Sequence, residues 1–218
     1  MPIRVKIWDL PTRLFHWVLV VLFSASVLTV QFDELVWHER SGIAILVLVS
    51  ARIIWAFIGS ETSRFSHFIK GPRSIIRYLS GIWRDRGNAV IGHNPVGGWV
   101  VVAFFVLLLL QAGTGLFAND EIFFEGPLAK HASREMSDTL TSVHHLIGES
   151  LLILVFIHIL ANILYWLVLK QNLIGPMLGG FKNLDSNPPK ALKWQRNAVA
   201  LATLAAVALI VWATIGFR

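Results

Sequence analysis

Five long runs of apolar residues are the feature that most constrains what this chain can fold into. The runs are 14–32, 42–59, 97–118, 141–169 and 197–217. A bilayer core of roughly 30 Å takes about 20 helical residues, and backbone that has no water to bind must be helical there. The sequence therefore predicts an all-α integral membrane helical bundle with five transmembrane helices. No small-residue cleavage site follows the first run, so we interpret it as a helix and not as a signal peptide.

The composition agrees with a membrane protein. Apolar residues make up 55% of the 218 residues and charged residues only 15%, which excludes most water-soluble enzymes. The net charge of +6 favours membrane lipid over nucleic acid as the partner, because the charges lie between the apolar runs. The chain contains no cysteine, which excludes disulfides, thiolate zinc sites, cysteine-bound iron–sulfur clusters and covalently attached haem.

Lysine and arginine predict the orientation of the bundle. Three alternate connections carry most of them: Arg4, Lys6, Arg13, Arg64, Lys70, Arg73, Arg77, Arg84, Arg86, Lys170, Lys182, Lys190, Lys193 and Arg196. The other two connections carry few basic residues and many acidic ones: Asp33, Glu34, Glu39, Asp120, Glu121, Glu125, Glu135 and Asp138. By the positive-inside rule, we expect a cytoplasmic N-terminus and a periplasmic C-terminus.

Histidines inside the apolar runs are the candidate functional residues, because polar groups in a membrane are costly and usually face an interior site. His16 lies in the first run, His38 lies at the outer edge of the second, and His144, His145 and His158 lie in the fourth. Fourteen helical steps of about 100° place His144 and His158 on one face, whereas His145 points roughly 140° away from His158.

The spacing of these histidines predicts two stacked haems. His144 and His158 are separated by roughly 21 Å along a helix, too far for one metal ion to bridge. With the predicted orientation, His16 lies at the depth of His158 and His38 at the depth of His144. We therefore expect the pairs His16/His158 and His38/His144 to ligate one haem iron each.

Other polar residues near this column have two interpretations each. Arg52 lies 14 residues after His38 on nearly the same face, so it suits a haem propionate; alternatively it extends toward the cytoplasm. His145 and Glu149 either hydrogen-bond to each other at the outer interface or form a candidate quinone or proton site. The small residues 112–115 either admit a flat macrocycle or allow close helix packing. We expect structural roles for His67, His93 and His131, which lie in loops.

Several motifs resemble the bacterial di-haem cytochrome b family that includes cytochrome b561 and the membrane subunits of nickel–iron hydrogenases. They comprise 14–17 (Leu-Phe-His-Trp), 38–42 (His-Glu-Arg-Ser-Gly), Arg52 with Trp55 and Gly59, 94–98 (Asn-Pro-Val-Gly-Gly), 111–115 (Gln-Ala-Gly-Thr-Gly), and His144 with His158. The similarity covers about residues 4–180. We accordingly divide the chain into a four-helix di-haem bundle, 1–180, and a cytoplasmic linker with a fifth helix, 181–218.

The resemblance implies two non-covalent haem b groups that pass electrons between the quinone pool of the bacterial inner membrane and a periplasmic redox partner. A hydrogenase, a reductase or a cytochrome c would serve as the partner. We expect an electron-transfer subunit of an oxidoreductase complex rather than a stand-alone enzyme. The alternatives are a quinone-linked superoxide oxidase, a haem-free membrane anchor and a transition-metal transporter.

Overall fold

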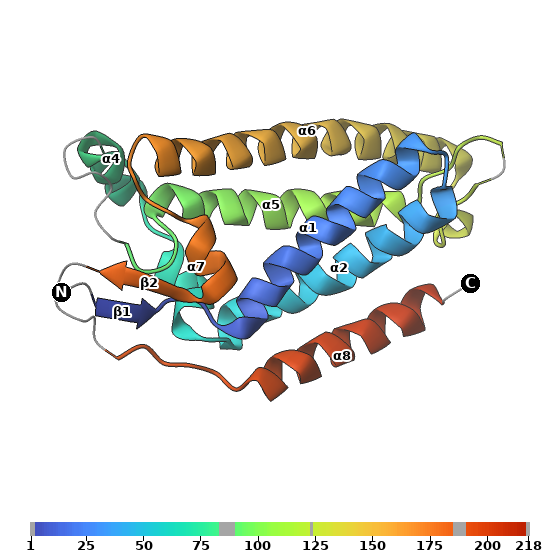
Figure 1. Cartoon of the computed structure of the whole chain (residues 1–218). Coiled ribbons are helices and arrows are strands. Elements are labelled where there is room, and N and C mark those ends of the chain that lie inside the picture. Colours follow the sequence, from blue (N-terminus) through green and yellow to red (C-terminus); the bar gives the residue numbers. More distant parts are fainter. Residues whose placement is uncertain (1–2, 83–89, 123, 185–190, 217–218) are drawn as a thin grey trace. The chain divides into compact units, whose positions relative to one another are not determined.

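The computed structural model describes residues 3–82, 90–122, 124–184 and 191–216. Among these residues, five helices are long and apolar enough to cross a membrane (Figure 1). They are α1 (Leu10–Gln31), α2 (Leu35–Ile58), α5 (Pro95–Gly115), α6 (Arg134–Leu167) and α8 (Asn197–Ile215). The predicted all-α membrane helical bundle is confirmed. Arg84, Arg86, Lys190 and Phe217, which the sequence analysis used, lie outside the described residues.

Four helices begin earlier than their apolar runs, α1 and α5 by a few residues and α2 and α6 by seven. α2 begins at Leu35 and not at 42, and α6 begins at Arg134 and not at 141. Hydropathy marks only the part of a helix that meets hydrocarbon, whereas α6, with 34 residues, is about 51 Å long. His38 therefore lies within the first turn of α2 rather than before it.

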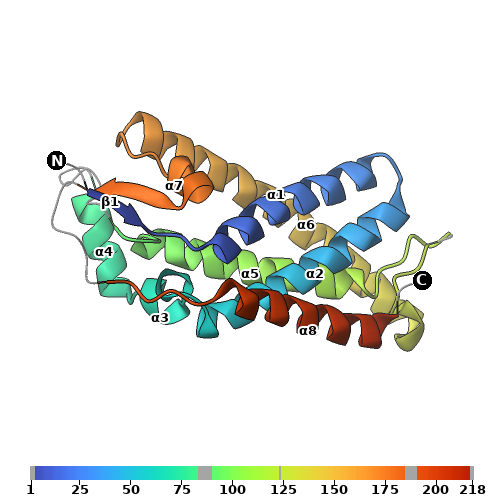
Figure 2. The same ribbon diagram turned by 60° about the horizontal axis from the view of Figure 1, so that its bottom comes forward.

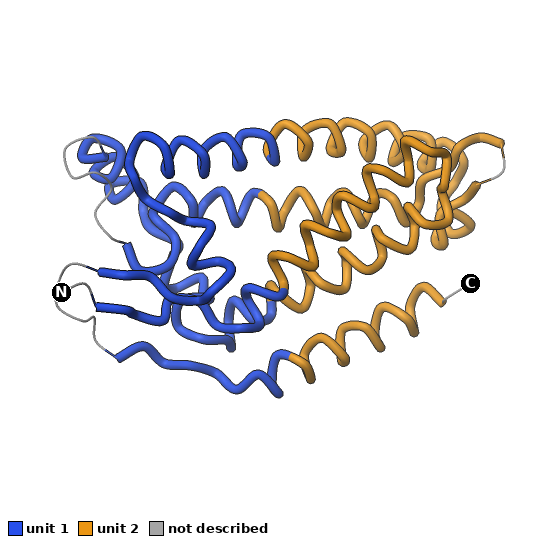
Figure 3. Tube along the Cα trace, in the orientation of Figure 1, with its two compact units in different colours: residues 1–14, 54–103, 155–200 blue, residues 15–53, 104–154, 201–218 orange. Residues whose placement is uncertain are grey.

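The chain forms two compact units, which are described separately (Figure 3). Unit 1 comprises residues 1–14, 54–103 and 155–200. Unit 2 comprises residues 15–53, 104–154 and 201–218. Each unit takes part of all five long helices.

Unit 1 contains a small sheet that the sequence analysis did not predict. β1 (Ile3–Lys6) pairs antiparallel with β2 (Phe181–Leu184), with Ile3 opposite Leu184 and Lys6 opposite Phe181. A short helix, α7 (Ile174–Gly179), precedes β2. Between them Gly180 has a φ of +84°, which favours glycine, and its carbonyl accepts the N–H groups of Ile7 and Trp8. The N-terminal strand is thereby tied to the segment that follows α6.

Asp9 joins three elements of unit 1. It precedes α1 and accepts the N–H of Thr12 at 2.8 Å, as an N-cap does. Its other oxygen accepts Nε1 of Trp55 from α2 at 3.1 Å and Oγ of Ser63 at 3.3 Å. Ser63 ends η1 (Glu61–Ser63), which leads into α3 (Phe65–Phe68) and α4 (Pro72–Gly81). The carboxylate is only 2% exposed, so these hydrogen bonds compensate for its burial.

The segment before α8 is also attached to unit 1. Glu61 and Lys193 exchange two hydrogen bonds, from Glu61 N to Lys193 O at 2.9 Å and from Lys193 N to Glu61 Oε2 at 3.0 Å. Gln195 N donates to Ser60 Oγ at 3.1 Å. The linker of the fifth helix is therefore held at the end of α2.

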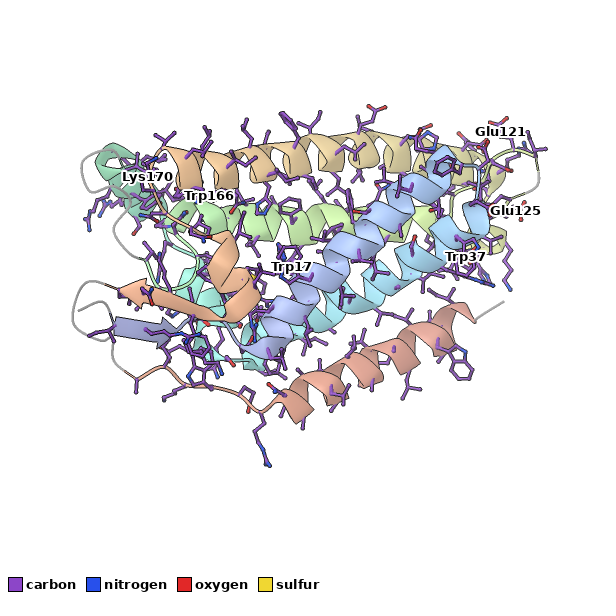
Figure 4. All side chains as sticks on the ribbon, viewed as in Figure 1. Trp17, Trp37, Glu121, Glu125, Trp166 and Lys170 are labelled. Atoms are coloured by element: carbon purple, nitrogen blue, oxygen red, sulfur yellow. The ribbon has the colours of Figure 1, made fainter. Side chains whose placement is uncertain are left out.

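Unit 2 contains the other parts of the five long helices and the connection between α5 and α6. Within it α5 and α6 run side by side (Figures 1 and 2). The connection includes η2 (Ala129–His131) and folds back on the helix ends, where Asn119 donates to Ser137 Oγ and Asp138 Oδ1 at 2.6 and 3.0 Å. Glu121 and Glu125 lie at its tip, at the same end of unit 2 as Trp37 (Figure 4).

Candidate functional site

The four candidate ligands lie on three of the long helices. His16 lies in α1, His38 in α2, and His144 and His158 in α6, and all four side chains are half-buried. α6 is one uninterrupted helix from Arg134 to Leu167. The angular argument that places His144 and His158 on one face therefore applies along its whole length.

Unit 2 brings His38 and His144 together. Their ring centres lie 6.0 Å apart and the two ring planes are nearly perpendicular, at 88°. A metal–imidazole nitrogen bond is about 2.0–2.1 Å long, so two imidazoles on opposite sides of one metal atom have ring centres roughly 6 Å apart. The separation of His38 and His144 fits a pair of axial ligands to one iron.

A hydrogen bond from Nδ1 to a backbone carbonyl orients each of the two rings. Nδ1 of His38 donates to the carbonyl oxygen of Ser26 at 2.9 Å, and Nδ1 of His144 donates to the carbonyl oxygen of Gln111 at 2.9 Å. Ser26 lies on α1 and Gln111 on α5, so neighbouring helices hold the two rings. A ring that donates through Nδ1 keeps a lone pair on Nε2 when neutral, which is the form that binds a metal.

Nε2 of His144 shows this lone pair in its contacts. Nε2 of the Gln111 amide lies 3.0 Å from it, and an amide N–H can only donate to a ring nitrogen that carries no proton. Thr114 adds a third contact, with its hydroxyl 3.3 Å from Nδ1. The chemistry of the donor set, two imidazoles whose Nδ1 atoms donate to carbonyls, fits a haem iron, for which the Gln111 amide would have to move away from Nε2 of His144.

Glycine makes room for the His144 ring. A Cβ added at Gly115 of α5 would lie 2.8 Å from Cε1 of His144, closer than van der Waals contact allows. At Gly113 the same addition meets no atom within 4 Å. Gly115 therefore permits the close approach of α5 to this histidine, while Gly113 has space around it.

Arg52 is buried among aromatic rings in unit 2. Its side chain is 4% exposed, and Cζ lies 5.7 Å from the ring centre of Phe15 and 5.6 Å from that of Phe105. Cation–π attraction favours a guanidinium at such distances. Arg52 does not extend to the surface, so the structure favours the interior position over the alternative of a side chain that reaches the cytoplasm.

The second predicted pair is divided between the two units. His158 lies in unit 1, where Asn162, one turn later on α6, has its amide nitrogen 3.3 Å from Nε2 of His158. His16 lies in unit 2, where its ring centre is 5.0 Å from that of Trp17. The pairing of His16 with His158 stays a prediction.

His145 and Glu149 are both exposed on α6, and among the described residues no hydrogen bond joins them. The ring centre of His145 lies 6.3 Å from that of His144, but His145 has no counterpart of the Gln111 contacts. Its exposure agrees with the angular argument that it points away from the histidine column. A role of His145 and Glu149 with quinone or protons stays a prediction.

The sequence analysis missed Ser26 and Gln111 as partners of the histidines. Gln111 is the only side-chain amide in α5, which is otherwise nearly all apolar, and a lone amide in a membrane helix is a signal for an interior contact. Ser26 acts through its backbone carbonyl, which no sequence pattern reveals. The loop histidine His93 packs against Trp8 and Phe68, with ring centres 4.7 and 4.9 Å away, in line with the structural role expected for it.

Comparison with known proteins gives a consistent result. The profile of the family described as prokaryotic cytochrome b561 matches residues 7–180. Similar proteins include probable Ni/Fe-hydrogenase B-type cytochrome subunits from three bacteria. That of Azotobacter vinelandii is 24% identical over 85% of this chain and 91% of its own. That of Rhodobacter capsulatus is 23% identical over 84% and 83%, and that of Bradyrhizobium diazoefficiens 26% over 81% and 85%. No solved structure gives a significant match.

Proposed function

We propose that this chain, which belongs to the prokaryotic cytochrome b561 family, conducts electrons between the membrane quinone pool and a redox partner at the outer surface. The chain is a multi-pass membrane protein and, as a b-type cytochrome, an electron-transfer protein that carries haem b. The observation that carries the proposal is the juxtaposition of His38 and His144, with ring centres 6.0 Å apart and both Nδ1 atoms on backbone carbonyls.

His38 and His144 would hold the outer haem, and His16 and His158 the second one. A haem held by two histidines would supply one-electron transfer rather than oxygen chemistry. Arg52 would bind a propionate, because its buried guanidinium presents the planar set of donors that matches a carboxylate. The backbone carbonyls of Ser26 and Gln111 would hold the two imidazoles in the orientation that turns Nε2 toward a metal, as the outer partners of metal-bound histidines do.

The partner would approach from the side that carries the α5–α6 connection. Glu121 and Glu125 lie there together with Trp37 (Figure 4), and the predicted orientation places them in the periplasm. The similar proteins from Azotobacter vinelandii and Rhodobacter capsulatus are named as hydrogenase subunits. We therefore propose a hydrogenase as the first partner to test, with a reductase or a cytochrome c as the other partners of the same chemistry.

The experiment is haem reduction by a quinol analogue in lipid nanodiscs that contain the purified chain. We expect b-type absorption bands to appear on addition of the quinol. The variant His38→Ala should lose the outer haem and retain the other, and His145→Ala should keep the haem content of the wild type. A folded wild type that shows no b-type bands with quinol or with dithionite would overturn the proposal.

A further inference from the structure

The only two tyrosines of the chain lie in hydrogen-bond contact in unit 1. The hydroxyl of Tyr78, on α4, is 2.7 Å from the hydroxyl of Tyr165, on α6. The Nδ2 group of Asn94 donates to the Tyr165 hydroxyl at 3.3 Å, and Oδ1 of Asn94 accepts the N–H of Gly97 at 2.7 Å. Asn94 is thus held at the start of α5 with its amide nitrogen directed at Tyr165.

This cluster continues a polar line along α6. Between Leu151 and Leu167, apart from Trp166, the side chains with hydrogen-bonding groups are His158, Asn162 and Tyr165. Their spacings of four and three residues place them within about 60° of one another on the helix. Asn162 lies between His158 and Tyr165 along the helix. Its Nδ2 group donates to the backbone carbonyl of His158 at 2.7 Å. The line from His158 to Tyr165 spans about 10 Å.

The far end of the line reaches the surface of unit 1. Tyr78 is half-buried, while its neighbours Arg77 and Leu79 on α4 are exposed. Burial, followed by the hydrogen bond to Tyr165, raises the pKa of Tyr78 above its usual value. Each phenol carries a hydroxyl that can accept one hydrogen bond while it donates another.

The interconversion of quinone and quinol requires a route for protons. Oxidation of a quinol breaks two O–H bonds and releases two electrons and two protons; reduction of a quinone takes up the same number of each. The electrons pass to or from the haems of the proposed function, but the protons need hydrogen-bonding groups that connect the membrane interior with water. In the Tyr78–Tyr165 pair either hydroxyl can be the donor, so a proton can pass in either direction without leaving a charge on the pair.

We propose that Tyr165 and Tyr78 form the proton-exchange route between quinone or quinol reacting near His158 and the water on the side of α4, the cytoplasm in the predicted orientation. The proposal rests on the proposed function. It gives the two tyrosines the role of proton-relay residues and assigns Asn94 to positioning, since its amide fixes one lone pair of Tyr165. This route differs from the exposed pair His145 and Glu149, which lies in unit 2.

The test compares Tyr165→Phe and Tyr78→Phe with Trp166→Phe as the matched control on α6. Trp166, which follows Tyr165 on α6 (Figure 4), is 54% exposed. Each variant in nanodiscs is first reduced with dithionite, which needs no relay, and its haem content is recorded. Stopped-flow reduction by a quinol analogue is then measured in H₂O and D₂O.

We expect both tyrosine variants to keep the wild-type haem spectrum and the dithionite reduction. Quinol-driven reduction should slow by roughly 10-fold or more, a typical loss for a proton-transfer group, with a changed solvent isotope effect. Trp166→Phe should match the wild type. If both tyrosine variants keep the wild-type rate and isotope effect, the relay is wrong while the proposed function stands. If wild-type haem is not reduced by quinol, the proposed function fails and the relay fails with it. Should one variant lose its haem, the other decides the outcome.

Discussion

The two ends of α6 hold their histidines in different ways. Around His144, side chains and carbonyls from α1, α2 and α5 close the site, and the ring contacts another histidine. Near His158, the amide nitrogen of Asn162 on the same helix lies 3.3 Å from Nε2, and Tyr165 with its partner Tyr78 follows one turn later. We propose that the first arrangement serves electron transfer and the second serves proton exchange. One helix would then contribute to electron transfer near one end and to proton transfer near the other.

Among the substitutions that test this comparison, removal of His144 should have the largest effect on haem binding. His144→Ala takes away one of two facing imidazoles, so we expect loss of the outer haem and of about half of the b-type absorbance. His145→Ala, one residue away, should leave the absorbance unchanged because its ring points elsewhere. Reduced-minus-oxidised spectra of both variants measure the effect. Equal losses in the two variants would contradict the assignment of His144 as the ligand.

Removal of the Asp9 carboxylate should destabilise unit 1 and leave the spectral signature of the His38–His144 haem in place. Asp9→Ala leaves the N–H of Thr12 without its cap and Nε1 of Trp55 without its acceptor. We expect a loss of about 2–3 kcal/mol, measured as a lower thermal unfolding midpoint in detergent. Asp9→Asn keeps one acceptor oxygen and should lose less. An unchanged midpoint in Asp9→Ala would show that the network contributes no stability.

A methyl group at Gly115 should weaken haem binding only at the outer site. In Gly115→Ala the new Cβ meets Cε1 of His144 at 2.8 Å, and the carbonyl of Gln111 restricts how far the ring can move. We expect haem affinity at this site to fall about 10-fold, measured by transfer of haem to apomyoglobin. Gly113→Ala, where the added atom meets nothing within 4 Å, is the matched control. Similar haem transfer from the two variants would remove the proposed role of Gly115.

Loss of the Thr114 hydroxyl should have the smallest effect. Thr114→Val removes a contact of 3.3 Å with Nδ1 of His144 but keeps the hydrogen bond from Nδ1 to the Gln111 carbonyl. We expect a change on the order of 0.5 kcal/mol in the free energy of reduction of the outer haem, measured as a shift of its midpoint potential in a redox titration. Thr214→Val on α8, where the threonine also bonds its own helix, should cause no change. A shift in the midpoint potential of the other haem instead would contradict the separation of the two sites.

The sequence predicted the parts of this molecule that depend on regular helices. Hydropathy identified the five spans, and the 100° step selected His144 over His145 as the residue on the face of His158. The helix starts at Leu35 and Arg134 were not predicted, because hydropathy does not detect helical turns outside the hydrocarbon of the membrane. The β1–β2 pairing was not predicted because each strand is only four residues long, too short for an alternating pattern to stand out, and the two lie far apart in the sequence. The Tyr78–Tyr165 contact was not predicted, because it joins the short helix α4 to the long helix α6. A contact between two single residues produces no periodic pattern in the sequence.

The central claim is that the bundle binds two haem b groups, one near each end of α6. Haem counted as the pyridine haemochromogen against protein concentration tests this claim most directly. We expect two haem b per wild-type chain and one per chain in His158→Ala, with the spectrum of the outer haem retained. A natively folded chain that binds a single haem, or a His158→Ala variant that keeps both, would contradict the account.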